Sequence, residues 1–339
     1  MANILPKISI IFPTYNAEDF IEKNLNSIKQ QEYPSALEVV IIDNNSKDQT
    51  TELIKKFESL NILLIKKSRN LGFAKACNIG VNKASGDFIF ITNQDVVFPP
   101  DFFRKCAKIY SKLDKNEDLI LSPAVIFPNG FIHYYGGEIH YSGISFCPQM
   151  YESLPEIGRT YKTSKASGCS IFMKKELFLN INGFDTFFFM YKEDVDFSMR
   201  ALRSSIPIYT SNETCLLHLK KKQELNDFIY YYLERNRFIL IMKHIANLRT
   251  ILFNLLIIEL TLIIHSVFEK KLFQRLKIYF SLLKNFRNLL GKRKYQNESL
   301  NPKFKKDQLN CSFPPILLGN KQNSTLLQYL LKILNKIIN

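Results

Sequence analysis

Three neighbouring polar residues have side chains that can bind a ligand. Asn93, Gln94 and Asp95 follow directly on the apolar and β-branched run Phe88 to Thr92. A short run of this kind predicts a strand that helices cover on both faces. In open α/β sheets, ligands bind at the carboxyl ends of such strands, because the loops diverge there and leave a crevice. The alternative interpretation of these three residues is a plain turn that closes a buried strand.

A second group of candidates is acidic, and a third candidate is a histidine. Glu193, Asp194 and Asp196 lie near a predicted helix start, where the helix macrodipole favours negative charge, so a structural explanation stays open beside a functional one. His218 follows the strand-like segment Ile206 to Tyr209. A lone histidine is more often an ordinary surface or core residue than a ligand, so none of these groups settles a function by itself.

The segments around these residues alternate between strand and helix patterns. After the apolar run Ile8 to Phe12, Asn16 can cap a helix in which Ile21, Leu25 and Ile28 recur at helical spacing. Further strands are expected at Val39 to Ile42, Ile62 to Ile65, Ile120 to Val125 and Ser167 to Met173, and a hairpin within Phe131 to Phe146. Alternating strands and helices predict βαβ units, hence an α/β domain of nucleotide-binding type with a mainly parallel sheet.

The turn after the first strand argues against one class of enzyme. It reads Pro13-Thr-Tyr-Asn16 and has no Gly-x-Gly-x-x-Gly to bring the backbone against a pyrophosphate. A dinucleotide-dependent oxidoreductase is therefore not supported, and nothing in the sequence supports a nucleotidyltransferase.

Length and composition indicate a globular protein of about two domains. The chain has 339 residues, of which 46% are hydrophobic, and its six cysteines are scattered without zinc-ligand spacing. Reduced thiols, together with a start that passes from Met1 into an apolar strand without a basic leader, predict a cytoplasmic protein.

The net charge of +15 is concentrated in the last third of the chain. Lys and Arg balance Asp and Glu at 24 each up to Leu219, whereas residues 220–339 hold 22 basic and 7 acidic residues. This basic region is also rich in Leu, Ile and Phe. Such a composition favours an anionic membrane surface over nucleic acid as its partner.

Three stretches of this basic region have helical patterns. Leu272 to Leu290 and Leu326 to Ile338 are amphipathic, whereas Leu248 to Phe268 is nearly apolar but contains Asn254 and Glu259. A central Glu costs on the order of a few kcal/mol in a bilayer core. The stretch Leu248 to Phe268 is therefore expected to lie in the membrane interface or to pack on a partner, and not to span the bilayer.

Seven segments, in order and spacing, resemble the inverting glycosyltransferases of family 2. Within that family the chain is similar to the rhamnosyltransferase-like enzymes of bacterial surface polysaccharide synthesis. The matching segments are Ile11-Phe-Pro-Thr-Tyr-Asn16, Ile42-Asp-Asn-Asn-Ser46, Arg69-Asn-Leu-Gly-Phe-Ala74, Gly86 to Asp95, Ser167-Gly-Cys169, Gly183-Phe-Asp185 and Phe189-Met-Tyr-Lys-Glu-Asp-Val-Asp196. The resemblance implies a GT-A catalytic domain over residues 1–245. For residues 246–339 it implies little, and there the charge and the helical patterns predict a basic, amphipathic helical and membrane-associated region.

The resemblance also implies a nucleotide-sugar site. Thr14 and Asp43 would line the base and ribose pocket, and Arg69 would lie beside the base or phosphate. The other residues assigned to the nucleotide sugar are Tyr15, Asn45, Gly72, Asn93 and Gln94.

A divalent metal ion is implied at two residues. Asp95 corresponds to the last acid of the Asp-x-Asp motif and would hold Mg²⁺ or Mn²⁺ on the diphosphate, and His218 matches the later histidine that approaches metal or diphosphate. The first motif position is Asn93, and a neutral amide is a weaker ligand for a hard cation.

Asp194 matches the catalytic base of the family, with Glu193 as its neighbour. A sugar hydroxyl is a poor nucleophile, so a carboxylate must take its proton as it attacks the anomeric carbon, and a single displacement inverts the configuration. The implied reaction transfers a sugar from dTDP-rhamnose or a UDP-hexose to a lipid-linked glycan, by a protein peripheral to the inner face of the cell membrane. The alternative is a catalytically weak or inactive glycan-binding or scaffold protein of the same fold, which Asn93 favours.

Overall fold

The computed structural model describes residues 6–114, 118–140, 142–156, 158–219, 226–244 and 259–291. The contacts divide the chain into two compact units. The first comprises Met1–Gly137 and Gln149–Gln223, and the second comprises Glu138–Pro148 and Glu224–Asn339. The helix Asp227–His244 groups with the second unit, and the division expected after residue 245 stays a prediction.

The first unit is built on one large sheet. Its strand order is β10-β12-β6-β11-β4-β1-β2-β3, with β5 paired to β12 and β7 paired to β6. The strands are β1 (Ile8–Thr14), β2 (Leu37–Asp43), β3 (Ile62–Lys66), β4 (Phe88–Thr92), β5 (Val96–Val97), β6 (Ile120–Ile126), β7 (Ile132–Tyr134), β10 (Thr160–Thr163), β11 (Ser170–Lys174) and β12 (Ile208–His218). The strands β1 to β4 are parallel, and β11 runs antiparallel to both β4 and β6.

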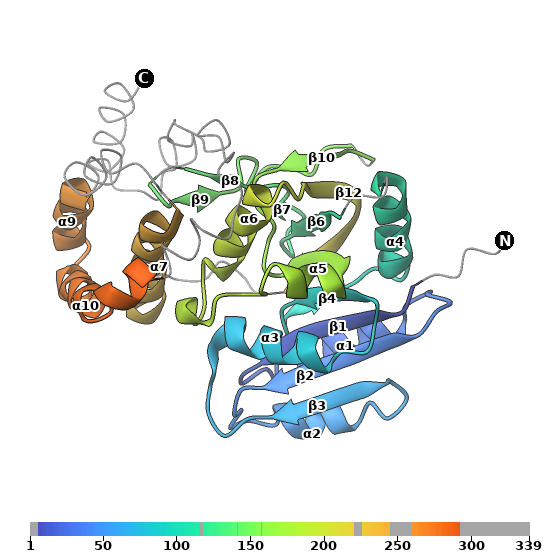
Figure 1. Ribbon diagram of the computed structural model, residues 1–339. Helices are drawn as coiled ribbons and strands as arrows, with labels where there is room; N and C mark the ends of the chain where they lie inside the picture. The colour runs from blue at the N-terminus through green and yellow to red at the C-terminus, as the bar shows by residue number, and fades with distance from the viewer. Residues whose placement is uncertain are drawn as a thin grey trace. The chain divides into compact units, whose positions relative to one another are not determined.

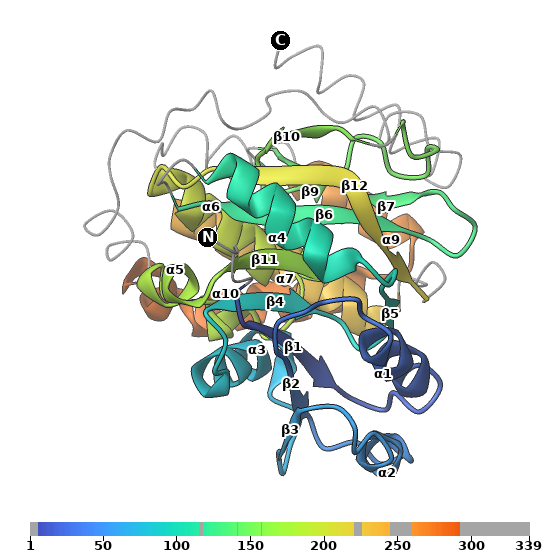
Figure 2. The ribbon, with the colours of Figure 1, turned by 90° about the vertical axis from the view of Figure 1, so that its right-hand side faces the viewer.

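Helices cover both faces of this sheet (Figures 1 and 2). They are α1 (Ile21–Lys29), α2 (Thr50–Lys55), α3 (Gly72–Lys83), α4 (Phe102–Leu113), α5 (Lys175–Asn180), the 3-10 turn η1 (Thr186–Phe188) and α6 (Glu193–Arg203). Successive residues of a strand point to opposite faces, so Ile10 packs in a core with α1 and α4, and Ile11 packs in a second core with α3, α5 and α6. Strands buried on both faces were expected from their unbroken apolar runs.

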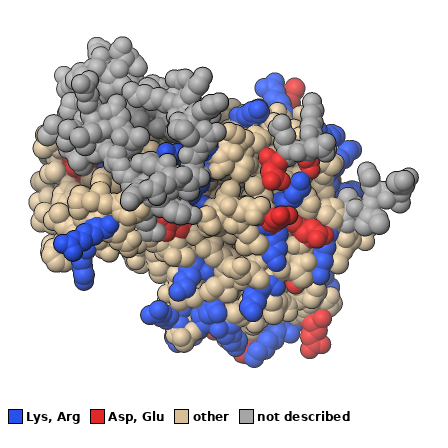
Figure 3. All heavy atoms as spheres, viewed as in Figure 1, with Lys and Arg blue, Asp and Glu red and all other residues tan. Residues whose placement is uncertain are grey.

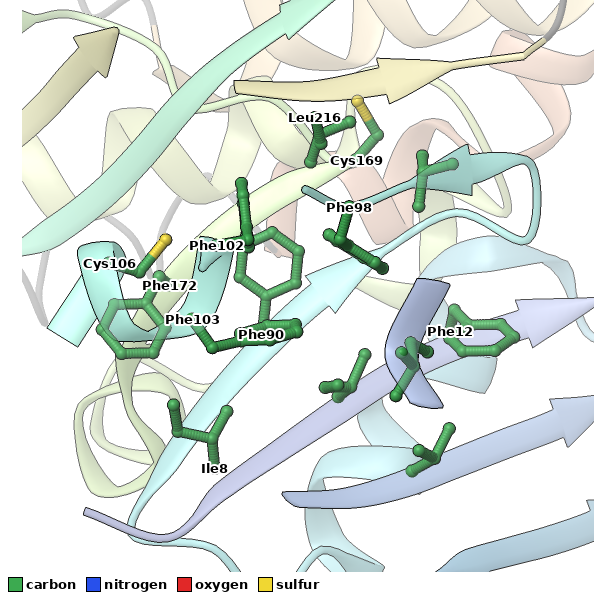
Figure 4. Packing of buried hydrophobic residues seen from close by; sticks show 14 of the residues in the cluster. Ile8, Phe12, Phe90, Phe98, Phe102, Phe103, Cys106, Cys169, Phe172 and Leu216 are labelled. Atoms are coloured by element: carbon green, nitrogen blue, oxygen red, sulfur yellow. The ribbon is translucent and has the colours of Figure 1, made fainter. Parts of the chain in front are cut away.

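Aromatic rings fill the first core where β4 meets α4. Phe90 makes edge contacts with Phe102 and Phe103, at ring-centroid distances of 5.2 and 5.5 Å (Figure 4). Phe98 joins the same group, and all four rings are buried. This packing holds β4 firmly in the sheet, and with it the polar residues that follow the strand.

Two local expectations were wrong. Helix α1 begins at Ile21, and Asn16 does not cap it, because the Asn16 side chain accepts a hydrogen bond from the Lys47 backbone N–H at 2.9 Å. The last strand is also much longer than its apolar start, since β12 runs from Ile208 to His218. His218 therefore belongs to the strand itself.

Within the described residues, the second unit contains a short hairpin and several helices. Strands β8 (Glu138–Ile139) and β9 (Ser145–Phe146) pair antiparallel, and the helices are α7 (Asp227–His244), α9 (Glu259–Phe268) and α10 (Leu272–Lys284). The hairpin lies within the stretch where one was predicted. Among the described residues, no helix is long and apolar enough to cross a membrane. The expected helix over residues 326–338 lies outside the described part of the chain.

The Glu259 side chain is buried and forms ion pairs with residues of α7 and α10. Its carboxylate is 2.7 Å from the Arg237 Nη2 and also bonds the Arg275 guanidinium and the Tyr279 hydroxyl. Arg275 further contacts Glu234 at 2.9 Å. Glu259 would make a bilayer-spanning helix costly. Its positively charged partners thus lie inside its own unit.

Candidate active site

The carboxyl ends of β1 and β2 bring Thr14 and Asp43 together. The two residues are register partners in parallel strands, and the Thr14 hydroxyl donates to Asp43 Oδ1 at 3.3 Å. The Ser46 backbone N–H lies 3.3 Å from both carboxylate oxygens. Both side chains are buried, so these contacts fix the Asp43 carboxylate at the sheet edge, and its contact with ribose or base stays a prediction.

The loops after β1 and β4 are joined by Gln94. Its Oε1 accepts from the Tyr15 backbone N–H at 2.8 Å, and its Nε2 donates to the Tyr15 carbonyl at 3.4 Å. The Tyr15 ring itself is exposed. Gln94 thus has a structural role within the site, and the exposed ring is free to contact a ligand.

The other predicted nucleotide residues differ in their surroundings. Asn45 has a φ of 70°, and its side-chain oxygen accepts from Lys47 Nζ at 2.9 Å, whereas the Arg69 side chain is exposed. Gly72 has a φ of +78°, and a Cβ there would lie 2.3 Å from the Phe189 carbonyl oxygen. Gly72 is therefore needed for close backbone packing, and its contact with the nucleotide stays a prediction.

Asp95, His218 and Asn93 meet where β5 pairs with β12. The His218 Nε2 lies 3.5 Å from Asp95 Oδ1 and 3.5 Å from Asn93 Nδ2. The backbones are joined as well, because the Leu219 N–H donates to the Asp95 carbonyl at 2.8 Å. The structure thus brings together the two residues predicted to bind metal.

His133, on β7, is a site residue that the sequence did not reveal. Its ring centroid lies 4.9 Å from that of His218. Burial lowers the pKa of His133 to about 3, with contributions from His218 and Lys165, so its imidazole is neutral at physiological pH. Among the described residues, the Nδ1 atoms of both histidines lack hydrogen-bond partners. His133 approaches His218 only in the folded protein, so no local sequence pattern could have identified it as part of the site.

The segment before α6 has an unusual backbone that places Glu193 and Asp194. Phe189, Tyr191 and Lys192 have φ values of 64°, 63° and 66°. Positive φ is costly for non-glycine residues and persists where the surroundings fix it, which is typical of functional sites.

The Gly183-Phe-Asp185 motif is fixed to helix α3. The Asn78 side chain bonds both backbone groups of Phe184, at 2.9 Å to its N–H and 2.7 Å to its carbonyl. The Asp185 carboxylate accepts from the Phe187 N–H at 3.0 Å and so caps η1. This motif therefore anchors the segment that leads to α6.

Both oxygens of the Asp194 carboxylate have partners. Oδ1 accepts from the Val195 N–H at 2.8 Å, and Oδ2 accepts from the Gly168 N–H at 3.1 Å. Lys165 Nζ lies 3.4 Å from Oδ2. Lys165 is in turn positioned by Tyr134, whose hydroxyl donates to the Lys165 carbonyl at 2.6 Å. Lys165 is the second site residue that the sequence did not reveal.

The three acids of the predicted cluster have different environments. Glu193 is buried, and burial together with the Asp194 carboxylate raises its pKa to about 8, so it is mostly protonated at pH 7. Asp196 is paired with Arg200 at 2.9 Å inside the protein, which is a structural role. Asp194 is the member whose carboxylate meets the positive charge of Lys165.

Gly168 and Cys169 link Asp194 to the end of β4, because the Gly168 N–H bonds the Asp194 carboxylate and Cys169 bonds Thr92. Burial raises the pKa of Cys169 to about 12, and the carboxylates of Asp95 and Asp194 both contribute to that shift. The Thr92 hydroxyl at the end of β4 donates to the Cys169 carbonyl at 2.8 Å. The candidate base is thus connected to the strand end that Asp95 follows by three residues.

Comparison with known proteins identifies the family. The model of glycosyl transferase family 2 matches residues 9–195, more than half of the chain. The chain belongs to this family. An uncharacterised glycosyltransferase of Haemophilus influenzae is 29% identical over 227 residues, which cover 65% of this chain and 71% of that protein. The poly(ribitol-phosphate) beta-N-acetylglucosaminyltransferase TarS of Staphylococcus aureus is 36% identical over 92 residues, which cover 26% of this chain and 16% of TarS.

Solved structures of GT-A glycosyltransferases share the fold. TarS 1-349 of Staphylococcus aureus, in complex with UDP-GlcNAc, aligns with a TM-score of 0.52 and 20% identity over 71% of this chain and 68% of that one. The mannosyltransferase PcManGT of Pyrobaculum calidifontis, in complex with GDP-Man and Mn²⁺, aligns with a TM-score of 0.54 and 17% identity over 87% and 86%. The expected GT-A fold and membership of family 2 are thus confirmed.

The donor atoms at Asp95 and His218 fit a divalent cation that the substrate helps to hold. Within the described residues, no three His, Cys, Asp or Glu side chains are grouped so that they could hold a metal by themselves. One carboxylate and one imidazole, 3.5 Å apart, leave most positions of a Mg²⁺ or Mn²⁺ shell to diphosphate and water. The two side chains therefore fit a divalent cation whose remaining ligands come from outside the protein.

Proposed function

We propose that this family 2 enzyme catalyses inverting sugar transfer from a nucleoside-diphosphate donor to a glycan hydroxyl, with Asp194 as the base. One observation carries the proposal: Gly168 and Lys165 hold the Asp194 carboxylate, and Cys169, the residue after Gly168, accepts a hydrogen bond from Thr92, three residues before Asp95. This link between the candidate base and the end of β4 supports a role for Asp194 and Asp95 in one active site.

The proton and electron movements follow from this arrangement. Asp194 takes the proton of the acceptor hydroxyl, and the oxygen attacks the anomeric carbon as the bond to the diphosphate breaks. A single displacement inverts the anomeric configuration. Glu193, protonated at pH 7, adds no second negative charge beside the base.

Residues at or just after the ends of strands would bind the sugar donor. Thr14 and Asp43 would bind the nucleoside, and Asp95 with His218 would hold Mg²⁺ or Mn²⁺. When bound, such an ion offsets the negative charge that develops on a departing diphosphate. The ligands named for TarS and PcManGT, UDP-GlcNAc and GDP-Man, support a nucleotide-sugar donor.

The substrates we propose are dTDP-rhamnose or a UDP-hexose as donor and a lipid-linked glycan of surface polysaccharide synthesis as acceptor. The acceptor would place the enzyme at the cytoplasmic face of the cell membrane, as a peripheral protein. Residues 220–339 hold 22 basic and 7 acidic residues, and this excess of positive charge supports the placement at a membrane.

A donor panel tests the proposal. The protein is mixed with UDP-, dTDP- and GDP-sugars, with and without Mn²⁺ or Mg²⁺, and its thermal stability and the release of nucleoside diphosphate are measured. We expect one donor to stabilise the protein in a metal-dependent way, because a ligand that binds the folded state raises its stability. Asp95→Ala should abolish this response, whereas Asp19→Ala, an exposed control, should keep it. No response to any donor would refute the proposal.

The second candidate is a binding protein without catalysis, and Asn93 is the observation that favours it. Asn93 Nδ2 lies 3.5 Å from His218 Nε2 and has no negative charge for a cation. In the same panel, such a protein would bind a donor but release no nucleoside diphosphate above background.

A further inference from the structure

Helices α9 and α10 expose large apolar side chains that share one face of each helix. On α9, Leu260, Ile264 and Val267 recur at spacings of four and three residues, and all three are exposed. On α10 the residues Phe273, Leu276, Phe280 and Leu283 repeat in the same way. Phe280 is 72% exposed and Leu283 73% exposed. We call these seven side chains, together with Phe268, the α9–α10 apolar surface.

The opposite sides of the two helices are fixed inside the second unit. Arg275 and Ile278 of α10 are buried, and the Arg275 guanidinium bonds Glu259 of α9 and Glu234 of α7. The Tyr230 hydroxyl accepts from Arg275 Nε at 3.0 Å. Glu259 and Arg275 thus point inward while the large apolar side chains point outward, because these buried ion pairs set the rotation of both helices.

Basic residues flank the apolar surface. Lys270, Lys277, Lys284 and Arg287 are exposed, and Glu269 is the one acidic residue in the sequence of residues 269–291. Lys277 Nζ lies 4.5 Å from the centroid of the Phe273 ring, so its aliphatic part follows the apolar surface. In Figure 3 the surface over these helices, at the left, is mainly uncharged, with Lys or Arg side chains at its lower edge.

We infer that the α9–α10 apolar surface is the site at which this protein inserts into an anionic lipid surface. Aromatic and aliphatic side chains on one side, edged by Lys and Arg, are the pattern of helices that lie in the plane of a membrane interface. A second copy of the chain is a poorer occupant, since two such basic edges would repel each other. The inference deepens the proposed function, and rests on it only for the claim that the acceptor is carried by the same lipid surface.

Vesicle flotation of the full chain tests the inference. The probes are vesicles of phosphatidylcholine alone and vesicles of phosphatidylcholine with phosphatidylglycerol. We expect binding to the anionic vesicles and a loss of at least about tenfold in Phe273→Ser/Phe280→Ser, because each buried ring contributes strongly to insertion. The matched control is Phe228→Ser, an exposed phenylalanine on α7 of the same unit. Lys277→Glu/Lys284→Glu should also weaken binding, with Lys55→Glu as its control.

Several outcomes would overturn the inference. These are an absence of wild-type binding, equal binding to neutral and anionic vesicles, or full binding by the Phe273→Ser/Phe280→Ser variant. A wild-type dimer that this variant converts to a monomer would assign the surface to a second copy instead. Nucleoside diphosphate release in solution, measured in parallel, separates the two proposals: vesicle binding without release would refute the catalytic function and leave the lipid surface standing.

Discussion

At the scale of single residues, the site depends on how each carboxylate is partnered. Asp194 has a backbone N–H on each oxygen and Lys165 as its counter-charge, so the orientation of its carboxylate is fixed without a ligand. Glu193, its neighbour in sequence, is buried and protonated at neutral pH. We propose that Asp194, the acid that contacts Lys165, is the base, and that the protonated Glu193 is not.

Replacing Lys165 should impair the reaction more than donor binding. We expect Lys165→Met to lower kcat by about ten- to a hundredfold, with the KM for the donor little changed, because Lys165 positions the base on the acceptor side. Steady-state kinetics measure both values. Lys162→Met is the matched control, since Lys162 is exposed, and Lys165→Arg should recover part of the rate. An unchanged kcat would show that Lys165 has no positioning role.

The buried Glu193 should make stability depend on pH. Its pKa is raised to about 8, against about 4.3 in an unfolded chain, so between these values the folded state holds the proton more tightly. Its contribution to stability is complete below about pH 4.3 and is lost as the pH rises toward 8, with a slope of up to about 1.4 kcal/mol per pH unit.

Urea unfolding from about pH 5 to pH 8 measures this slope. Glu193→Gln removes the titrating group and should flatten the fall in the free energy of unfolding. Identical slopes in the variant and the wild type would contradict the assignment of a buried, protonated Glu193.

At the scale of elements, the segment between η1 and α6 depends on α3. The Ala74 N–H donates to the Phe189 carbonyl at 3.2 Å, and this contact is possible because Gly72 has no Cβ. Three positive φ angles within residues 189–192 are held by such contacts, and Asp194 follows two residues later.

Gly72→Ala should therefore displace this segment. We expect a loss of about 1–3 kcal/mol in the free energy of unfolding, from the positive φ and the clash with Phe189 together. Gly130→Ala is a matched control, because Gly130 has a φ of +82° but open space around its Cβ position. Thermal unfolding compares the two variants, and equal losses would mean that the contact with Phe189 contributes nothing.

The sequence predicts the central strands well and the last strand poorly, for a physical reason. Phe88 to Thr92 is an unbroken apolar and β-branched run, so its burial can be predicted from these residues alone. The middle of β12 instead contains Ser211 and Asn212, which are buried because other segments supply their partners. The Asn212 side-chain oxygen accepts from the backbone N–H groups of Gly158 and Arg159, at 3.1 and 2.8 Å. Partners so distant in sequence leave no periodic pattern.

The same distinction applies to the site. Asp95, Asp194 and His218 were predicted because they stand in motifs that the family resemblance carries. Lys165 and His133 were not, because their importance comes only from neighbours that the fold brings close, Asp194 for one and His218 for the other.

At the scale of the whole molecule, the sequence indicates a neutral first region and a basic second region. Buried ion pairs hold the helices of the second region together. Glu259 interrupts an apolar stretch, which suggested an interfacial or packed helix. The structure shows α9 packed through Arg237 and Arg275, which lie 22 and 16 residues from Glu259 in sequence. Removing one partner of such a buried network is costly because the others remain charged. The network therefore stabilises the orientation in which α9 and α10 expose their apolar residues.

The most direct test of the account compares the wild type with Asp194→Asn, using the donor that the panel identifies and a glycan acceptor. Donor binding, product formation and the anomeric configuration of the product are measured together. We predict that the wild type forms a product of inverted configuration. Asp194→Asn should bind the donor with similar affinity but lose about 10²- to 10⁴-fold in transfer rate, because it cannot take the acceptor proton. Transfer at the full rate by Asp194→Asn, or a product of retained configuration, would contradict the account.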